Sequence, residues 1–324
     1  MTQIHTSSFG YTDLLPSSYF QAALRSDIRK GLSLRQKRTS PVWFYDQRGS
    51  ALYEQITELP AYYPHRCEHA ILSQYAGAIA DRTRARTLVE LGSGASTKTK
   101  LLLNALTLDR YIPIDVSASA LRLASSQIAG EYPRLDVQAL RADFNDAFAL
   151  PEVHGSKLIV FMGSTIGNYR APARARFLHR LRQAMGPDDA LLLGADLVKP
   201  VTELVAAYAD PTGVTAAFSK NLLQVLHHEL QADFDPDTFE HVASWDSTEQ
   251  CIEMRLRSTR DQVVSIPALG MKVTFQQGED WITETSAKFS PQRLRTELAA
   301  ADLAITDSWT DQAARFSVSL AVPL

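Results

Sequence analysis

An acid and two glycines stand at the end of a short apolar run, at Glu90, Gly92 and Gly94. Glycines lack the Cβ atom that would keep a ligand away from the backbone. Ser96 follows at a position suited to cap a helix, and the first N–H groups of a helix bind anionic ligand groups. This order of strand, glycine turn and helix predicts a site for a nucleotide-like ligand at the edge of a parallel sheet.

The position of a third glycine separates two cofactor classes. A dinucleotide-binding loop carries a third glycine, whereas this chain has Thr97 there. That difference argues against a nicotinamide-dependent oxidoreductase. The spacing without the third glycine resembles the S-adenosylmethionine loop of Rossmann-like methyltransferases. For the loop alone, an ordinary glycine turn stays open as an alternative.

Polar and aromatic residues follow the next apolar runs, each of which predicts a strand. Asp115 lies about 20 residues beyond the glycines, where an acid accepts hydrogen bonds from ribose hydroxyls. Asp143 and Phe144 suit an adenine ring, because the carboxylate accepts from the amino group and the aromatic ring packs against the base. A fourth run ends at Gly163. Since the carboxyl ends of parallel strands meet at one edge of a sheet, we expect these residues to gather there.

The alternation of apolar runs and helical periods over residues 67–200 is typical of a parallel α/β sheet. Residues 287–324 add an antiparallel pair, so we predict a Rossmann-like, seven-stranded methyltransferase sheet built from 67–200 and 287–324. Residues 1–66 and 201–286 are expected to form a second α+β domain for substrate recognition, with the binding cleft between the two domains.

The individual elements follow from the same patterns. Pro60 and Pro64 are expected to bracket an extended linker. Residues 201–250 are expected to be mostly helical, and the strands after them antiparallel. The expected helices lie at 27–34, 50–59, 97–107, 118–129, 172–185 and 218–230. The expected strands lie at 87–91, 111–115, 137–140, 158–163, 191–197, 252–257, 263–275, 281–289, 303–306 and 316–322.

Composition argues against several classes of partner. The 324 residues carry a net charge of only −3, which disfavours a large nucleic-acid surface. Cys67 and Cys251 have no C-x-x-C spacing and are expected to be reduced thiols. No apolar run reaches the ~20 residues of a membrane span, and the first residues show no secretory signal. We therefore expect a cytoplasmic protein that binds neither nucleic acid nor membranes. We also expect it to be a monomer, although nothing in the sequence determines the oligomeric state.

Seven stretches spread over nearly the whole chain carry a more specific signal than the glycine loop. They are Phe44-Tyr45-Asp46 with Gly49-Ser50, and residues 59–64, 90–94, 163–168, 193–199, 234–236 and 283–289. On these stretches the chain resembles the histidine-specific Nα-methyltransferases of ergothioneine biosynthesis.

The resemblance implies transfer of methyl groups from S-adenosyl-L-methionine to the α-amino group of L-histidine. Three rounds pass through the mono- and dimethyl forms to the Nα-trimethyl betaine. Asn168 and Tyr45 are implied as catalytic residues, and no metal is implied. The implied cofactor-binding residues are Tyr45, Gly92, Lys98, Asp115, Asp143 and Phe144. The implied substrate-binding residues are Tyr62, Gly163, Thr165, Asn168, Tyr208, Met254, Glu284, Thr285 and Ser286.

In the family, the asparagine and the later tyrosine hold the α-carboxylate end of the substrate, and the glutamate and serine hold the imidazole. Glu284 and Ser286 also suit that role by themselves, because residues two apart on a strand point to the same face. A carboxylate accepts an imidazole N–H, and a hydroxyl can donate to or accept from the other nitrogen. An exposed acid on a sheet face stays the alternative for Glu284. Trp281 and Ile282 stand where the family is expected to carry methionine and arginine, a departure that concerns the outer wall of the pocket.

Three other interpretations stay open. His65-Arg66-Cys67-Glu68-His69 fits the H-x-x-E-H pattern of zinc hydrolases, but no third ligand is evident, and we expect no metal. A methyltransferase of the same fold for another amino acid, such as tryptophan, is disfavoured by Glu284, since indole offers one N–H and no acceptor. The third is a non-catalytic protein that only binds S-adenosylmethionine.

Overall fold

The computed structural model describes residues 9–94, 98–144 and 153–324. Its largest element is an eight-stranded sheet. The strands are β1 (Gly10–Asp13), β2 (Thr87–Leu91), β3 (Arg110–Asp115), β4 (Asp136–Arg141), β5 (Lys157–Phe161), β6 (Ala190–Asp196), β12 (Leu303–Thr310) and β13 (Phe316–Pro323). Their order in space is β1-β4-β3-β2-β5-β6-β13-β12, and β13 runs antiparallel to β6 and β12 whereas the other pairs are parallel. The expected α/β, Rossmann-like class is confirmed.

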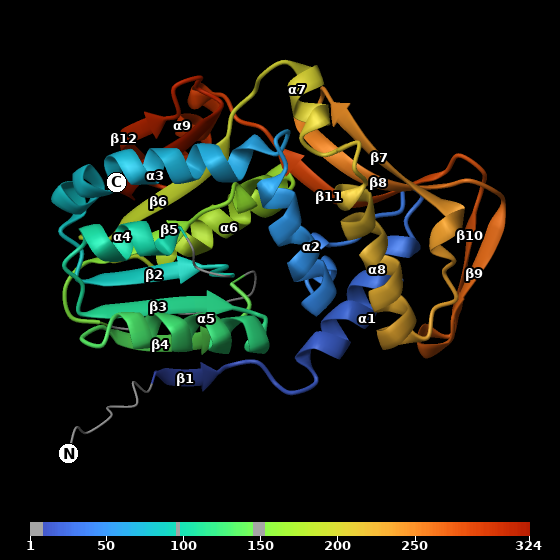
Figure 1. Ribbon diagram of the computed structural model, residues 1–324, viewed down its shortest axis with the longest axis horizontal. Coiled ribbons are helices and arrows are strands. Elements are labelled where there is room, and N and C mark those ends of the chain that lie inside the picture. Colours follow the sequence, from blue (N-terminus) through green and yellow to red (C-terminus); the bar gives the residue numbers. More distant parts are fainter. Residues whose placement is uncertain (1–8, 95–97, 145–152) are drawn as a thin grey trace.

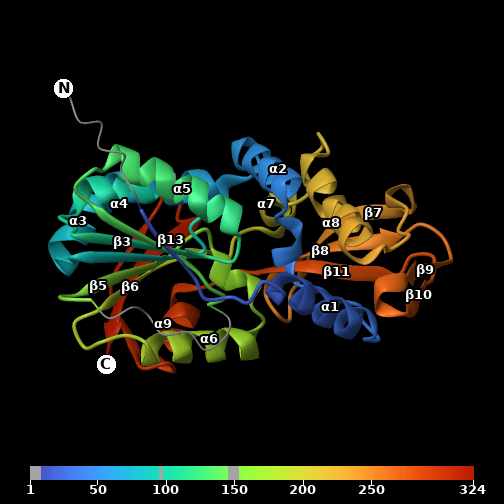
Figure 2. The same cartoon turned by 90° about the horizontal axis from the view of Figure 1, so that it is seen from below.

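Helices cover both faces of this sheet (Figure 1 and Figure 2). One face carries α3 (Tyr63–Thr83), α4 (Thr99–Ala105) and α5 (Ala118–Glu131), and the other carries α6 (Ala171–Gln183) and α9 (Pro291–Ala299). Successive side chains of β2 point to opposite faces of the sheet. Leu88 packs in the core with α3 and α4, and Val89 packs in the core with α6 and α9. A strand buried on both faces is largely apolar, which is why the sequence reveals it.

A second group of elements lies beyond the carboxyl ends of the central strands (Figure 1). It contains a three-stranded antiparallel sheet, β11-β8-β7, and a β9-β10 hairpin packed with helices. Its helices are α1 (Tyr19–Leu32), α2 (Gln47–Glu58), α7 (Val201–Ala206) and α8 (Val214–Leu230). Its strands are β7 (Phe239–Asp246), β8 (Cys251–Ser258), β9 (Gln262–Ile266), β10 (Met271–Phe275) and β11 (Asp280–Ala287).

The first departures from expectation are near the N-terminus. Residues 10–13, assigned from the sequence to the second domain, form β1 and pair in parallel with β4, so the sheet has eight strands rather than seven. The residues of β1 are half-buried or exposed and lack the apolar pattern of a central strand. The expected linker at Pro60–Pro64 is wrong, because Tyr63 begins α3 with Pro64 in its first turn. Proline suits that turn, since its missing N–H has no helical partner there.

The second group also differs in part from expectation. The single strand expected at 263–275 is the β9-β10 hairpin, which turns at Pro267–Leu269 and Gly270. The helical pattern expected over 201–250 misses β7, and the helix expected at 27–34 is the longer α1. Trp281 is 0% exposed and stacks on Phe234 with ring centroids 5.5 Å apart, so this side chain fills a core. In the described part of the chain, no helix has the length and apolar character needed to cross a membrane.

Candidate active site

The glycine turn after β2 has the backbone of a loop that a ligand can approach closely. Gly92 and Gly94 have φ values of +70° and +48°, in the left-handed region that other residues rarely adopt. The Asp115 carboxylate at the end of β3 accepts a hydrogen bond from the Gly94 N–H at 3.4 Å. Burial raises the pKa of Asp115. The predicted cap Ser96 lies outside the described residues.

Asp143 and Phe144 follow β4 beside the same turn. The Phe144 ring lies 3.8 Å from the place that a Cβ on Gly92 would take, and it packs edge-on against Phe161 with centroids 5.7 Å apart. The Tyr19 hydroxyl at the start of α1 donates a hydrogen bond to the Asp143 carboxylate. The N-terminal part of the chain therefore reaches the end of the site expected to hold adenine.

Lys98 forms a buried ion pair with Glu68 of α3. Glu68 is 0% exposed, and its two carboxylate oxygens also lie 2.9 and 3.0 Å from the backbone nitrogen of Gly163, which donates to them. Although burial alone lowers the pKa of Lys98, Glu68 raises it above its usual value. A Cβ on Gly194 would lie 2.0 Å from Glu68 Oε1, so only glycine leaves room for the carboxylate. Glu68 thus contacts both Lys98, which is expected to bind the cofactor, and the backbone of the turn after β5.

Four tyrosine rings connect the expected cofactor residues with the expected substrate residues. The centroids are 5.6 Å apart for Tyr45 and Tyr53, 6.4 Å for Tyr53 and Tyr62, and 6.0 Å for Tyr62 and Tyr208. All three pairs are edge-to-face, a favoured arrangement of aromatic rings. The row runs from Tyr45, which is 39% exposed, to Tyr208, which is 6% exposed.

Glu284 and Ser286 lie on β11 beyond a bulge between Ile282 and Glu284. Because the strand is regular after the bulge, Glu284 and Ser286 point to the same face. Met254 of β8 is the cross-strand partner of Glu284. Burial raises the pKa of Glu284 to about 7, and the positive charge of Lys288 acts in the opposite direction. The half-buried Glu284 therefore differs from an ordinary exposed acid.

The hydroxyls of Ser286 and Tyr208 form one cluster with a buried lysine. Ser286 Oγ and Tyr208 Oη lie 3.0 Å apart, and Lys288 Nζ lies 2.8 Å from each oxygen. The same Nζ lies 2.7 Å from Asp196 Oδ2, at the carboxyl end of β6. This cluster connects the central sheet to β11.

Gly163, Thr165 and Asn168 lie in the turn after β5. Gly163 has a φ of +73°, and Asn168 ends the short 3-10 helix Thr165–Asn168. The Thr285 hydroxyl donates to the Asn168 backbone oxygen at 3.5 Å. A Cβ on Gly167 would lie 2.8 Å from a backbone oxygen of β11, so the turn packs closely against that strand. The structure thus places the Asn168 turn beside the strand that carries Glu284.

Three charged residues of this site were not predicted, namely Glu68, Asp196 and Lys288. Lys288 continues the spacing of Glu284 and Ser286 by two residues, and this alternation is a signal that could have found it. Glu68 is the acid of the H-x-x-E-H pattern, and its carboxylate is engaged by Lys98 and the Gly163 N–H. No pattern along the chain shows that these acids lie next to lysines distant in sequence.

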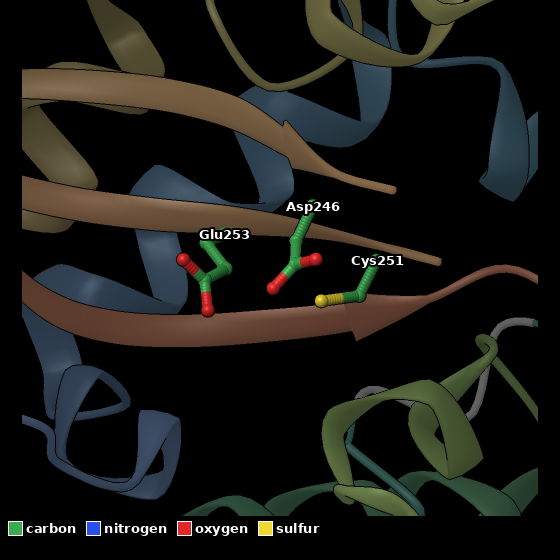
Figure 3. A group of neighbouring side chains, drawn as sticks. All are labelled: Asp246, Cys251 and Glu253. Carbon is green, nitrogen blue, oxygen red and sulfur yellow. The ribbon is translucent and has the colours of Figure 1, made fainter. Parts of the chain in front are cut away.

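Asp246, Cys251 and Glu253 form a separate cluster with ligand atoms within 4.8 Å of one another (Figure 3). Glu253 already pairs with Arg255 at 2.7 Å, and Asp246 accepts the N–H of Thr248 at 2.9 Å. The pKa of the Cys251 thiol is raised to about 11, mainly by burial and to a smaller extent by the negative charges of Glu253 and Asp246. The protein's own contacts therefore account for this cluster without a cation.

The sheet with its glycine turn and the acids at the adjoining strand ends fits an S-adenosylmethionine-dependent methyltransferase, and sequence comparison shows that the chain is of this class. A family model described as "Histidine-specific methyltransferase, SAM-dependent" matches residues 24–323, and the chain belongs to this family.

Curated relatives cover most of the chain. It is 50% identical to a histidine N-alpha-methyltransferase of Mycolicibacterium smegmatis, over 93% of this chain and 95% of the relative. It is 48% identical to the protein of that name from Mycobacterium tuberculosis, over 92% of this chain and 94% of the relative. Ergothioneine biosynthesis protein 1 of Neurospora crassa is 32% identical over 56% of this chain and 22% of the relative.

Proposed function

We propose that this protein transfers methyl groups from S-adenosyl-L-methionine to the α-amino group of L-histidine. Three rounds give Nα,Nα,Nα-trimethyl-L-histidine (hercynine), the first step of ergothioneine biosynthesis. The family and the relatives support the reaction. The assignment of histidine as the substrate rests on one observation. The half-buried Glu284 carboxylate lies on the same strand face as the Ser286 hydroxyl, and an imidazole ring has a polar nitrogen for each of them.

The residues at the sheet edge fit S-adenosylmethionine. Gly92 and Gly94 expose backbone at the turn, and the Asp115 carboxylate beside them suits ribose hydroxyls. Asp143 and Phe144 suit the adenine. Lys98 keeps a positive charge that suits the carboxylate of the methionine part. When bound, the cofactor supplies a methyl group on a sulfonium, which is activated for displacement.

Positioning of the amine is the main task of the protein. In-line displacement requires a neutral amine that lies close to the methyl group and collinear with the bond between that group and sulfur. Most of the rate enhancement is expected to come from holding the two reactants in this arrangement. We assign the α-carboxylate end of histidine to Asn168 and Tyr208, with Gly163 and Thr165 near the amine. The faces of Tyr45 and Tyr62 suit the growing cation, because aromatic faces attract quaternary ammonium groups.

The two parts of the molecule divide this work in the same proposal. Residues 67–200 and 287–324, joined by β1, form the methyltransferase domain that holds the cofactor. The rest of residues 1–66 and 201–286 supplies most of the substrate recognition, including Met254 and Thr285. We further propose that the protein acts as a monomer in the cytoplasm, without nucleic-acid or membrane partners.

One incubation tests the proposal. The pure protein is given S-adenosylmethionine and an equimolar mixture of the twenty amino acids, and the products are read by mass spectrometry. We expect histidine to gain three methyl groups and the other amino acids to stay unmodified. Methylation of another amino acid, such as tryptophan, would overturn the role of Glu284, and no methylation at all would overturn the enzymatic proposal.

A further inference from the structure

Lys288 lies directly behind the two hydroxyls that the proposed function assigns to the substrate. Its side chain is 0% exposed, and Nζ donates to Asp196 Oδ2 at 2.7 Å and to the hydroxyl oxygens of Tyr208 and Ser286 at 2.8 Å each. An ammonium group has three protons and no acceptor, so these three contacts use all of its donors. Lys288 therefore acts on a ligand only through its neighbours.

The charge of Lys288 is maintained by Asp196. Burial alone lowers the pKa of a lysine, but the adjacent Asp196 carboxylate raises the pKa of Lys288 above its usual range. Asp196 is also 0% exposed and accepts from Tyr63 at 2.9 Å and from Lys199 at 2.6 Å. The carboxylate is thus fully engaged, and Lys288 stays an ammonium donor.

This donor restricts the hydroxyl protons. Each hydroxyl oxygen accepts one hydrogen bond from Lys288, so its own proton points elsewhere. The two oxygens lie 3.0 Å apart, and at most one of the two protons fits between them. At least one O–H is therefore left for another acceptor. Because the proposed function gives Tyr208 to the α-carboxylate, we assign the Ser286 O–H to the imidazole nitrogen. The site therefore presents a hydroxyl donor next to Glu284, which is an acceptor when ionised.

We propose that Lys288 is a positioning residue that makes the site specific for a neutral imidazole ring. Such a ring has one N–H for Glu284 and one lone pair for the hydroxyl donor. A pyrrole or indole ring has the N–H but no lone pair, so it leaves a buried O–H without a partner and binds more weakly. This inference rests on the proposed function, because it takes L-histidine as the ligand.

The test compares L-histidine with its two pyrrole analogues, in each of which a C–H replaces one ring nitrogen. Binding is measured by titration calorimetry with S-adenosylhomocysteine present. For the wild type we expect a preference of about tenfold or more for histidine over the better analogue, as one unpaired buried O–H predicts. For Lys288→Met we expect this preference to be largely lost, with the affinity for S-adenosylhomocysteine little changed.

Lys199→Met is the matched control. Lys199 contacts the same Asp196 carboxylate but neither substrate hydroxyl, and it is likewise buried, with a side chain 5% exposed. We expect Lys199→Met to keep the preference for histidine. A selective loss in Lys288→Met supports the proposal, because a general change in charge or stability would affect both variants alike.

The remaining outcomes are decisive as well. If Lys288→Met does not bind S-adenosylhomocysteine, the variant Lys288→Met/Asp196→Asn, which removes both charges, takes its place with the same expectation. Equal binding of histidine and an analogue by the wild type, a preference retained without Lys288, or an equal loss in Lys199→Met would each overturn the inference. A wild type that does not bind histidine at all would instead overturn the proposed function.

Discussion

Glu68–Lys98 and Asp196–Lys288 are both buried lysine–carboxylate pairs, but they face the site in different ways. Among the described residues, Glu68 is the one hydrogen-bond partner of Lys98 Nζ, and the Lys98 side chain is 15% exposed. Lys288 is 0% exposed and has all three donors engaged within the protein. Lys98 can thus offer its charge to a ligand, whereas Lys288 directs two neutral hydroxyls.

The carboxylates differ in the same way. Glu68 also accepts the Gly163 N–H, so it connects its lysine to a turn of the backbone. Asp196 instead holds Lys199 and Tyr63, which belong to a buried cluster of side chains. In the proposed site, the same type of lysine–carboxylate pair therefore serves charge recognition at the cofactor end and the orientation of hydroxyl groups at the substrate end. Substitutions on the two sides should therefore separate the two affinities.

Glu284→Ala should give the largest separation. We expect the affinity for histidine to fall about 50-fold, because a hydrogen bond to a charged acceptor is lost. The affinity for S-adenosylmethionine should be little changed. Calorimetric titration of each ligand checks this, and equal losses of both affinities would contradict the role of Glu284 in substrate recognition.

Glu68→Gln should act on the opposite side. The amide can still accept from Gly163 but no longer pairs with the charge of Lys98, so we expect about a 20-fold loss of cofactor affinity. Glu131→Gln is the matched control, because Glu131 at the end of α5 pairs with Lys100 in the first turn of α4, and their side chains are 48% and 40% exposed. An exposed pair contributes little, so the control should bind normally. Equal effects of the two substitutions would remove the distinction between Lys98 and an ordinary surface lysine.

Gly194→Ala should disturb the Glu68 pair without changing any charge. Its Cβ would lie 2.0 Å from Glu68 Oε1, so the carboxylate must move. We expect about a fivefold weaker binding of S-adenosylmethionine and a lower melting temperature, as overpacking of a buried site costs roughly 1–3 kcal/mol. Gly77→Ala within α3 meets no atom within 4 Å and should be neutral or slightly stabilising. A tolerated Gly194→Ala would show that Glu68 has room to shift.

The smallest expected effect is a pH dependence of stability. Glu284 has a pKa raised from 4.5 to about 7, chiefly by burial, so its ionised form is disfavoured in the folded protein. Below pH 4.5, the pKa of Glu284 in the unfolded chain, the group is protonated in both states and does not destabilise the fold. As pH rises from there through about 7, the unfolded chain loses this proton more readily than the folded protein, so the free energy of unfolding falls. Glu284→Gln should flatten this part of the profile. Melting temperatures of both ligand-free proteins from about pH 5 to about pH 8 check this, and parallel profiles would contradict it.

The sequence indicated the central strands well and the peripheral elements poorly. Strands such as β5 and β6 are buried on both faces, so their apolar runs are continuous and visible. β1 has no such run, and its place in the sheet depends on pairing with β4. The prediction of an extended linker at Pro60–Pro64 is wrong, because a proline can mark the end of an element but also suits the first turn of a helix, where Pro64 lies.

By itself, the sequence determined the α/β class, the glycine turn and the membership of the family. These depend on local periodicity and on residue types at fixed spacing, which the chain carries along its length. It also showed that Glu284 and Ser286 share a strand face. Only the tertiary structure decided which buried charges meet, because Glu68 with Lys98 and Asp196 with Lys288 come from distant segments. A buried charge is stable only beside its partner, so these pairings are a property of the packed fold.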